Sequence, residues 1–197
     1  MELLLIRHAL PERIETQDGS PADPPLSAIG RTQAERMARW LEAEPIGAIY
    51  ASPMRRARET ADALARAVQV EVAIDADFVE MDHLSAVYVP LEQLKAEDYP
   101  RWQEMIQRGG LYAGVDLPAF RRSVVGAVER AIAAHRGGRV AIVCHGGVIN
   151  AWAGHVLGIA DPFFCDVAYT GVSRFLAAST GERSVRSLNE TAHLRES

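Results

Sequence analysis

The sequence has little of several features that would point to other classes of protein. It contains two cysteines, Cys144 and Cys165, whose spacing fits neither a disulfide framework nor a zinc site. It has no apolar run long enough to span a bilayer, and its start does not resemble a signal peptide, because Glu2 and Arg7 interrupt the apolar residues. We therefore expect a cytoplasmic protein without a metal, a cofactor or a membrane partner.

Positive charge is also scarce. The chain has 21 lysine and arginine residues against 26 acidic ones, a formal net charge of −5, which argues against a nucleic-acid partner. Hydrophobic residues make up 48% of its 197 residues, enough for one well-buried core. We expect a single domain over residues 1–197. The sequence leaves the oligomeric state open, with a homodimer as one alternative.

What the sequence does contain is a short apolar run that ends abruptly on two polar residues. Leu3-Leu4-Leu5-Ile6 leads directly into Arg7 and His8, as in a buried strand whose carboxyl end opens on a ligand crevice. Arginine offers a charged planar fork for phosphate oxygens, and neutral imidazole is a nucleophile near neutral pH. The pair indicates phosphoryl chemistry. For one dipeptide alone, however, the simpler interpretation is that a strand reaches the surface there.

Two further strand ends support the phosphoryl interpretation. The run 139–144 ends on His145-Gly146-Gly147 before a helix, and a helix N-terminus with glycine attracts anions. The run 48–53 leads into a helix that starts with three arginines, Arg55, Arg56 and Arg58. These three cannot share one helix face, so at most two of them can point into the crevice.

The rest of the chain alternates helical and strand patterns. Such alternation predicts an α/β fold with helices on both faces of a mostly parallel sheet, a three-layer α/β/α sandwich. We expect helices over residues 28–41, 56–68, 120–132 and 148–157, and later strands over 171–177 and 185–188.

Residues 82–117 break this alternation. Two short helices are expected there, over residues 91–95 and 99–107, in a stretch with several prolines and aromatic residues. We interpret the stretch as a small cap inserted over the crevice, where substrate specificity would reside. A surface segment that packs on the sheet without covering the crevice is an alternative with equal support.

Five short motifs follow one another along the chain. They are Arg7-His8-Ala9, the segment 26–34, the segment 52–61, Glu80-Met81-Asp82 and Cys144-His145-Gly146-Gly147. In this order they resemble the motifs of the histidine phosphatase superfamily, which includes phosphoglycerate mutases and many small phosphatases. The resemblance spans nearly the whole chain.

The resemblance implies a role for several residues. His8 would be the nucleophile that forms a phosphohistidine, and Arg56 would be the phosphate-binding arginine of the 52–61 motif. Ser27 would lend its hydroxyl to the phosphate, but it fits a plain helix N-cap at least as well. The side chains and amides expected around the phosphoryl group are Arg7, Arg56, His145, Gly146 and Ser27.

The same resemblance implies that Glu80 is the general acid and base. Glu80 must protonate the leaving oxygen and then activate water, which requires a carboxyl pKa raised toward neutrality by burial. Its neighbours Phe78, Val79 and Met81 are apolar, as such burial requires. Asp82 is the rival for this role.

Departures from the family pattern bear on the substrate. The mutases continue their first motif with polar residues, whereas this chain has Ala9-Leu10-Pro11. This favours a phosphatase of phosphorylated small molecules. The alternatives are a phosphoglycerate mutase-type transferase and a weakly active regulatory protein that binds phosphorylated ligands. His83 and His193 are expected to be structural or on the surface. The segment 189–194 resembles the ending of some phosphatases of the superfamily, which implies that it docks near the pocket.

Overall fold

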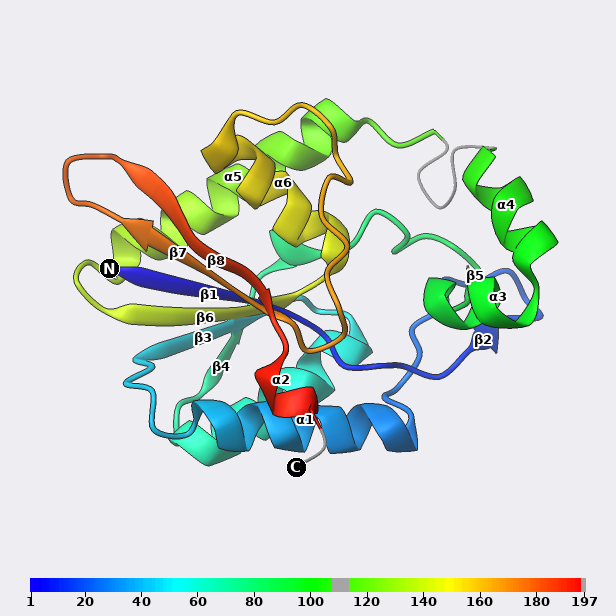
Figure 1. Cartoon of the computed structure of the whole chain (residues 1–197), viewed down its shortest axis with the longest axis horizontal. Helices are drawn as coiled ribbons and strands as arrows, with labels where there is room; N and C mark the ends of the chain where they lie inside the picture. The colour runs from blue at the N-terminus through cyan, green and yellow to red at the C-terminus, as the bar shows by residue number, and fades with distance from the viewer. Residues whose placement is uncertain (108–113, 196–197) are drawn as a thin grey trace.

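The computed structural model describes residues 1–107 and 114–195 (Figure 1). A six-stranded sheet in the order β4-β3-β6-β1-β7-β8 forms its centre. β4, β3, β6 and β1 run parallel, β7 is antiparallel to β1, and β8 is antiparallel to β7. This confirms a mostly parallel sheet. The strands are β1 (Glu2–Arg7), β3 (Ala48–Ala51), β4 (Val72–Ile74), β6 (Arg139–Cys144), β7 (Val172–Ala177) and β8 (Arg183–Glu190).

Helices cover both faces of the sheet, as predicted (Figure 1). α1 (Ala28–Leu41) and α2 (Arg55–Val68) lie on one face, and α5 (Leu117–Ala134) and α6 (Gly146–Leu157) lie on the other. α5 begins three residues before the predicted start. The Asp116 carboxylate accepts a hydrogen bond from the Ala119 amide there, and such a cap lengthens a helix beyond its apolar stripe.

Side chains of β1 alternate between the two cores. Leu3 and Leu5 pack with Trp152 of α6, whereas Leu4 and Ile6 pack with Met37 of α1, and all six are fully buried. Because both of its faces are buried, this strand must lie in the middle of the sheet, and its first polar residues mark where the chain reaches the edge of the sheet. Its end lies beside the end of β6, so the residues that follow both strands meet at the same edge.

A second, smaller unit lies beyond the carboxyl end of β1 (Figure 1). β2 (Ile14–Glu15) pairs with β5 (Val87–Tyr88), and α3 (Leu91–Glu97) and α4 (Tyr99–Gln107) lie next to this pair. The two predicted short helices are present, and α3 is two residues longer than expected. Residues 108–113 of the predicted cap lie outside the described part of the chain.

The end of the described chain packs against α1. The short 3₁₀ helix η3 (Ala192–Leu194) places the His193 ring on Trp40, with centroids 5.1 Å apart. The His193 Nε2 atom lies 2.9 Å from the Thr170 hydroxyl, and the Thr170 amide donates to the Arg7 carbonyl. The tail thus docks behind the end of β1. No helix in the described ranges is long and apolar enough to cross a membrane.

Candidate active site

Three strand ends bring four predicted site residues together. Arg7 is the last residue of β1 and pairs in register with Cys144, so His8 and His145 lie side by side with ring centroids 5.0 Å apart. Arg56 comes from the first turn of α2, after β3, and donates from Nε to His8 Nε2 at 3.2 Å. Both histidines and Arg56 are buried. The predicted grouping of Arg7, His8, Arg56 and His145 is present.

His8 is held as a neutral ring with a defined tautomer. Its Nδ1 lies 2.8 Å from the Ala9 carbonyl, so Nδ1–H donates there and the lone pair is on Nε2. Burial, followed by the charges of Arg56 and Arg7, lowers the pKa of His8 well below 6.5. Nε2 is therefore unprotonated at neutral pH, as a nucleophile requires.

Each arginine is fixed by a carboxylate and an aromatic ring. Arg56 Nη2 donates to Asp82 at 3.0 Å, and its guanidinium lies 4.5 Å from the centre of the Tyr88 ring. The Arg7 guanidinium lies 3.8 Å from the centre of the Tyr169 ring. Arg56 Nη1 is buried and has no partner within the described residues. A buried cationic donor without an acceptor indicates room for an anion.

His145 presents a second buried donor. Its Nε2 lies 2.8 Å from the Ser52 hydroxyl, while Nδ1 is buried with no partner in the described part of the chain. Burial, then Arg56, His8 and Arg7, lowers the pKa of His145 well below 6.5, so the ring is neutral. When Ser52 donates to Nε2, the proton is on Nδ1, where none of the described residues accepts it. Gly146 then begins α6, whose first amides lack partners within the helix.

Glu80 is a buried carboxyl group held by two backbone amides. One oxygen accepts from the Met81 amide at 3.0 Å and the other from the Gly147 amide at 2.9 Å. Burial, then the neighbouring Asp82, raises the pKa of Glu80 to about 7, against the lowering effect of the two amides. A Cβ at position 147 would collide with the Glu80 carboxylate, so glycine is required for this close approach.

Comparison with known proteins agrees with this geometry. A family model described as histidine phosphatase superfamily (branch 1) matches residues 3–191. The chain belongs to this superfamily. It is 29% identical over 202 residues to phosphoserine phosphatase 1 of Hydrogenobacter thermophilus, covering 100% of this chain and 95% of that protein.

Two other comparisons define the extent of the superfamily match. The chain is 28% identical over 200 residues to a bifunctional protein of Mycobacterium tuberculosis, but it spans only 54% of that longer protein. A crystal structure of a phosphoserine phosphatase mutant from Entamoeba histolytica, in complex with phosphoserine, aligns with a TM-score of 0.74 at 20% identity. That alignment covers 98% of this chain and 99% of the other and confirms the predicted fold.

Other predicted residues of this histidine phosphatase superfamily member lie elsewhere. Ser27 caps α1, where its oxygen accepts from the Gly30 amide and its hydroxyl donates to the Leu10 carbonyl, both at 3.0 Å. The N-cap alternative is thus confirmed, and the hydroxyl proton is already in use. Arg55 and Arg58 are exposed, and Arg55 pairs with Glu59 on the surface.

Sequence reasoning missed several residues that shape the site. Tyr88 and Tyr169 cover the two arginines, and the Thr60 hydroxyl joins the Ala9 amide to the Arg56 carbonyl. Glu92 of α3 accepts a hydrogen bond from Arg7 Nη1 at 2.8 Å. Tyr88, Tyr169 and Glu92 have no local sequence signal, because each reaches the site from a loop or short element whose position depends on tertiary packing. Thr60 lies within the 52–61 motif, but its bridging role is visible only in the structure.

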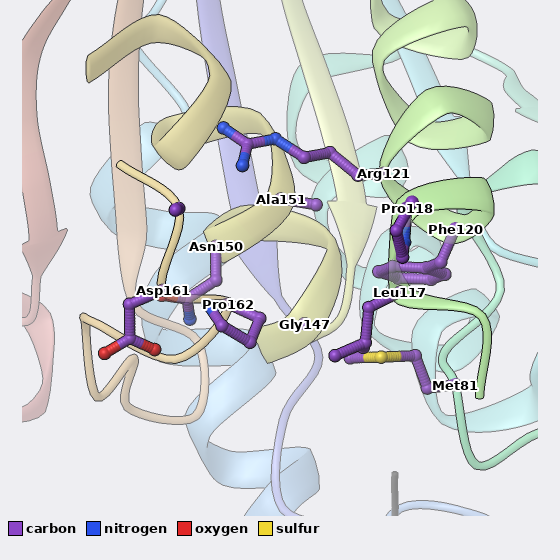
Figure 2. A pocket seen from close by; sticks show the side chains of 11 residues that line it. Met81, Leu117, Pro118, Phe120, Arg121, Gly147, Asn150, Ala151, Asp161 and Pro162 are labelled. Carbon is purple, nitrogen blue, oxygen red and sulfur yellow. The ribbon is translucent and has the colours of Figure 1, made fainter. Parts of the chain in front are cut away.

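A cavity of about 250 Å³ opens between α5 and α6 (Figure 2). Met81 and Leu117 line one side, Asn150 and Pro162 line the other, and Gly147 lies between them. Met81 and Gly147 also supply the amides that bind Glu80. The cavity therefore reaches the residues that hold the predicted proton donor, and the arginines and histidines described above do not line it.

Proposed function

We propose that this protein hydrolyses phosphomonoesters of small molecules through a phosphohistidine on His8. The observation that carries the proposal is the set of buried donors around His8 Nε2. Arg56 Nη1 and His145 Nδ1 lack partners in the described residues, and Arg7 Nε lies 4.0 Å from the Cβ position at Gly146, the first residue of α6. Phosphoryl transfer places charge on three equatorial oxygens, and such donors stabilise that charge.

The first step forms the phosphoenzyme. The His8 Nε2 lone pair attacks phosphorus, the bond from phosphorus to the ester oxygen breaks, and the Glu80 carboxyl gives its proton to the departing oxygen. The Ala9 carbonyl, 2.8 Å from His8 Nδ1, stabilises the positive charge that develops on the ring. Asp82 is paired with Arg56, so we assign the proton transfer to Glu80.

The second step releases inorganic phosphate. The Glu80 carboxylate takes a proton from water, the water oxygen attacks phosphorus, and the bond from Nε2 to phosphorus breaks. His8 returns to its neutral form and Glu80 to its protonated form. Two displacements through a covalent intermediate thus replace one difficult displacement.

The arrangement favours water over a second substrate hydroxyl as the acceptor. Ala9 and Leu10, which follow His8, are buried and apolar, so this segment offers no polar side chain to a second acidic group of a substrate. We therefore prefer a phosphatase to a mutase. The name of the 29% identical relative makes phosphoserine the first compound to assay.

We further propose that residues 82–107 and 114–117 act as the cap of this single domain and that the enzyme works in the cytoplasm. One observation supports the location: both cysteines are free. The net charge of the chain is −5. This charge favours a small phosphorylated substrate over nucleic acid. A homodimer stays a prediction.

The direct test is hydrolysis of an aryl phosphate in the presence of a chelator, with alkaline quenching to trap phosphoenzyme. We expect turnover to continue with metal removed, since arginines supply the positive charge, and we expect a phosphoenzyme that is labile to acid and stable to base. Activity that requires an added metal would refute the proposed mechanism. Phosphate transfer that needs a bisphosphate primer would indicate the mutase instead.

Glu80→Gln is expected to lower kcat/KM for alkyl phosphates by about 10²–10⁴-fold and for aryl phosphates much less, because a phenolate leaves without a proton. In the wild type, kcat/KM for alkyl esters should fall above pH 7, where the free Glu80 carboxyl, with its pKa of about 7, loses its proton. The variant should lack this decline. Rate profiles from pH 5 to 9 measure both effects.

The exposed Glu71 provides the control, since Glu71→Gln changes the same group far from the site. Equal losses for alkyl and aryl esters in Glu80→Gln would remove Glu80 from the proton transfer.

A further inference from the structure

Glu92 is an acidic side chain in a place where an anionic substrate must arrive. It lies on α3, and its Oε1 accepts from Arg7 Nη1 at 2.8 Å. The same Nη1 donates to the Val167 carbonyl at 2.5 Å. Within the described ranges both acceptors of the Arg7 side chain bind Nη1, so Nη2 and Nε remain available for the phosphoryl group. Arg7 Nε lies 4.0 Å from the Cβ position at Gly146, so this side of the guanidinium faces the start of α6.

The two arginine–carboxylate pairs of the site differ in access. The Asp82 side chain is 4% exposed and is enclosed with Arg56, whereas the Glu92 side chain is 47% exposed. Burial of Glu92 opposes its ionisation, but the charge of Arg7 prevails and lowers the pKa of the carboxyl. Glu92 is thus an ionised carboxylate at the mouth of the site, open to a further partner.

This carboxylate changes the charge that the site presents. Asp82 and Glu92 offset the charges of Arg56 and Arg7, and the two histidines are neutral. A phosphate dianion without a nearby cation is repelled by Glu92, while a substrate that carries its own cation is attracted. The Glu92 carboxylate and a phosphoryl oxygen that both bind the Arg7 guanidinium lie within about 5 Å of each other. A substrate whose ammonium group is two carbons from the ester oxygen is long enough to reach from one to the other.

We propose that Glu92 selects phosphomonoesters that carry an ammonium group close to the phosphate. This inference rests on the proposed function and names the substrate class of the same site. The phosphoryl group binds the inner side of Arg7, and the ammonium group donates to the open side of the Glu92 carboxylate. No covalent step involves Glu92; it acts as a specificity determinant.

The test compares two esters that differ in one group, O-phosphoethanolamine and ethyl phosphate. We expect wild-type kcat/KM to favour phosphoethanolamine by about tenfold, as one charge-assisted hydrogen bond provides. Glu92→Gln should remove most of this preference by lowering kcat/KM for phosphoethanolamine and raising it for ethyl phosphate. Glu97→Gln, at an exposed acid of the same helix, should keep the wild-type ratio.

Two other outcomes would contradict the proposal that Glu92 selects esters with an ammonium group. If Glu92→Gln raises kcat/KM equally for both esters, Glu92 only competes with phosphate for Arg7. An unchanged ratio excludes any contact with the ammonium group. Calorimetric binding of both compounds to His8→Ala measures the preference without turnover. Aryl phosphate hydrolysis by the wild type, assayed in parallel, shows separately whether the proposed phosphatase activity holds.

Discussion

His8→Ala is expected to lower the turnover of every phosphomonoester by at least about 10⁴-fold and to abolish phosphoenzyme formation. The reason is that no other described group can replace the unprotonated Nε2, which the Ala9 carbonyl and Arg56 hold in place. His145 is the nearest candidate, but Ser52 engages its Nε2. Steady-state hydrolysis of an aryl phosphate and alkaline-quench trapping of phosphoenzyme measure the two effects.

The matched control is His155→Ala, because His155 is an exposed histidine on α6. It should retain wild-type turnover. Retained binding of inorganic phosphate by His8→Ala, measured by calorimetry, would show that the arginines still form the anion site. A His8→Ala enzyme with near-normal turnover would exclude the phosphohistidine route.

Much of the site could be predicted because it lies at the ends of buried strands. A strand buried on both faces reads as a continuous apolar run, so its last residues mark the ligand edge. The apolar runs before Arg7 and before His145 each predict a buried strand that ends at this edge. The parallel register that pairs Arg7 with Cys144 then places His8 beside His145, as the fold class requires.

The rest depends on packing between distant segments. Tyr169 reaches Arg7 from the loop before β7, and Tyr88 reaches Arg56 from β5; neither loop nor short strand has a periodic pattern. β4 was missed because it has three residues, two of them exposed, and so lacks alternation. Asp82 was weighed as an acid, whereas its buried pairing with Arg56 is visible only in the tertiary structure.

Arg56→Met is expected to affect both activity and stability. Removing a preorganised donor from the phosphoryl site should lower kcat/KM by about 10²–10³-fold. The change also leaves the buried Asp82 carboxylate without its partner, which typically costs about 3–5 kcal/mol of unfolding free energy. Arg55→Met is the matched control: Arg55 precedes Arg56 on α2, its side chain is 57% exposed, and its loss should cost less than about 0.5 kcal/mol.

A second substitution separates the two effects of Arg56. In Arg56→Met/Asp82→Leu no charge is left unpaired, so denaturant unfolding should show most of the lost stability restored, since a buried ion pair replaced by apolar groups is often nearly neutral. Activity should stay as low as in Arg56→Met, because the phosphoryl donor is still absent. Recovery of turnover together with stability would mean that Arg56 only holds the fold. Recovery of stability alone would show that Arg56 binds the phosphoryl group and that Asp82 serves as the ion-pair partner of Arg56. Glu80 would then remain as the proton donor.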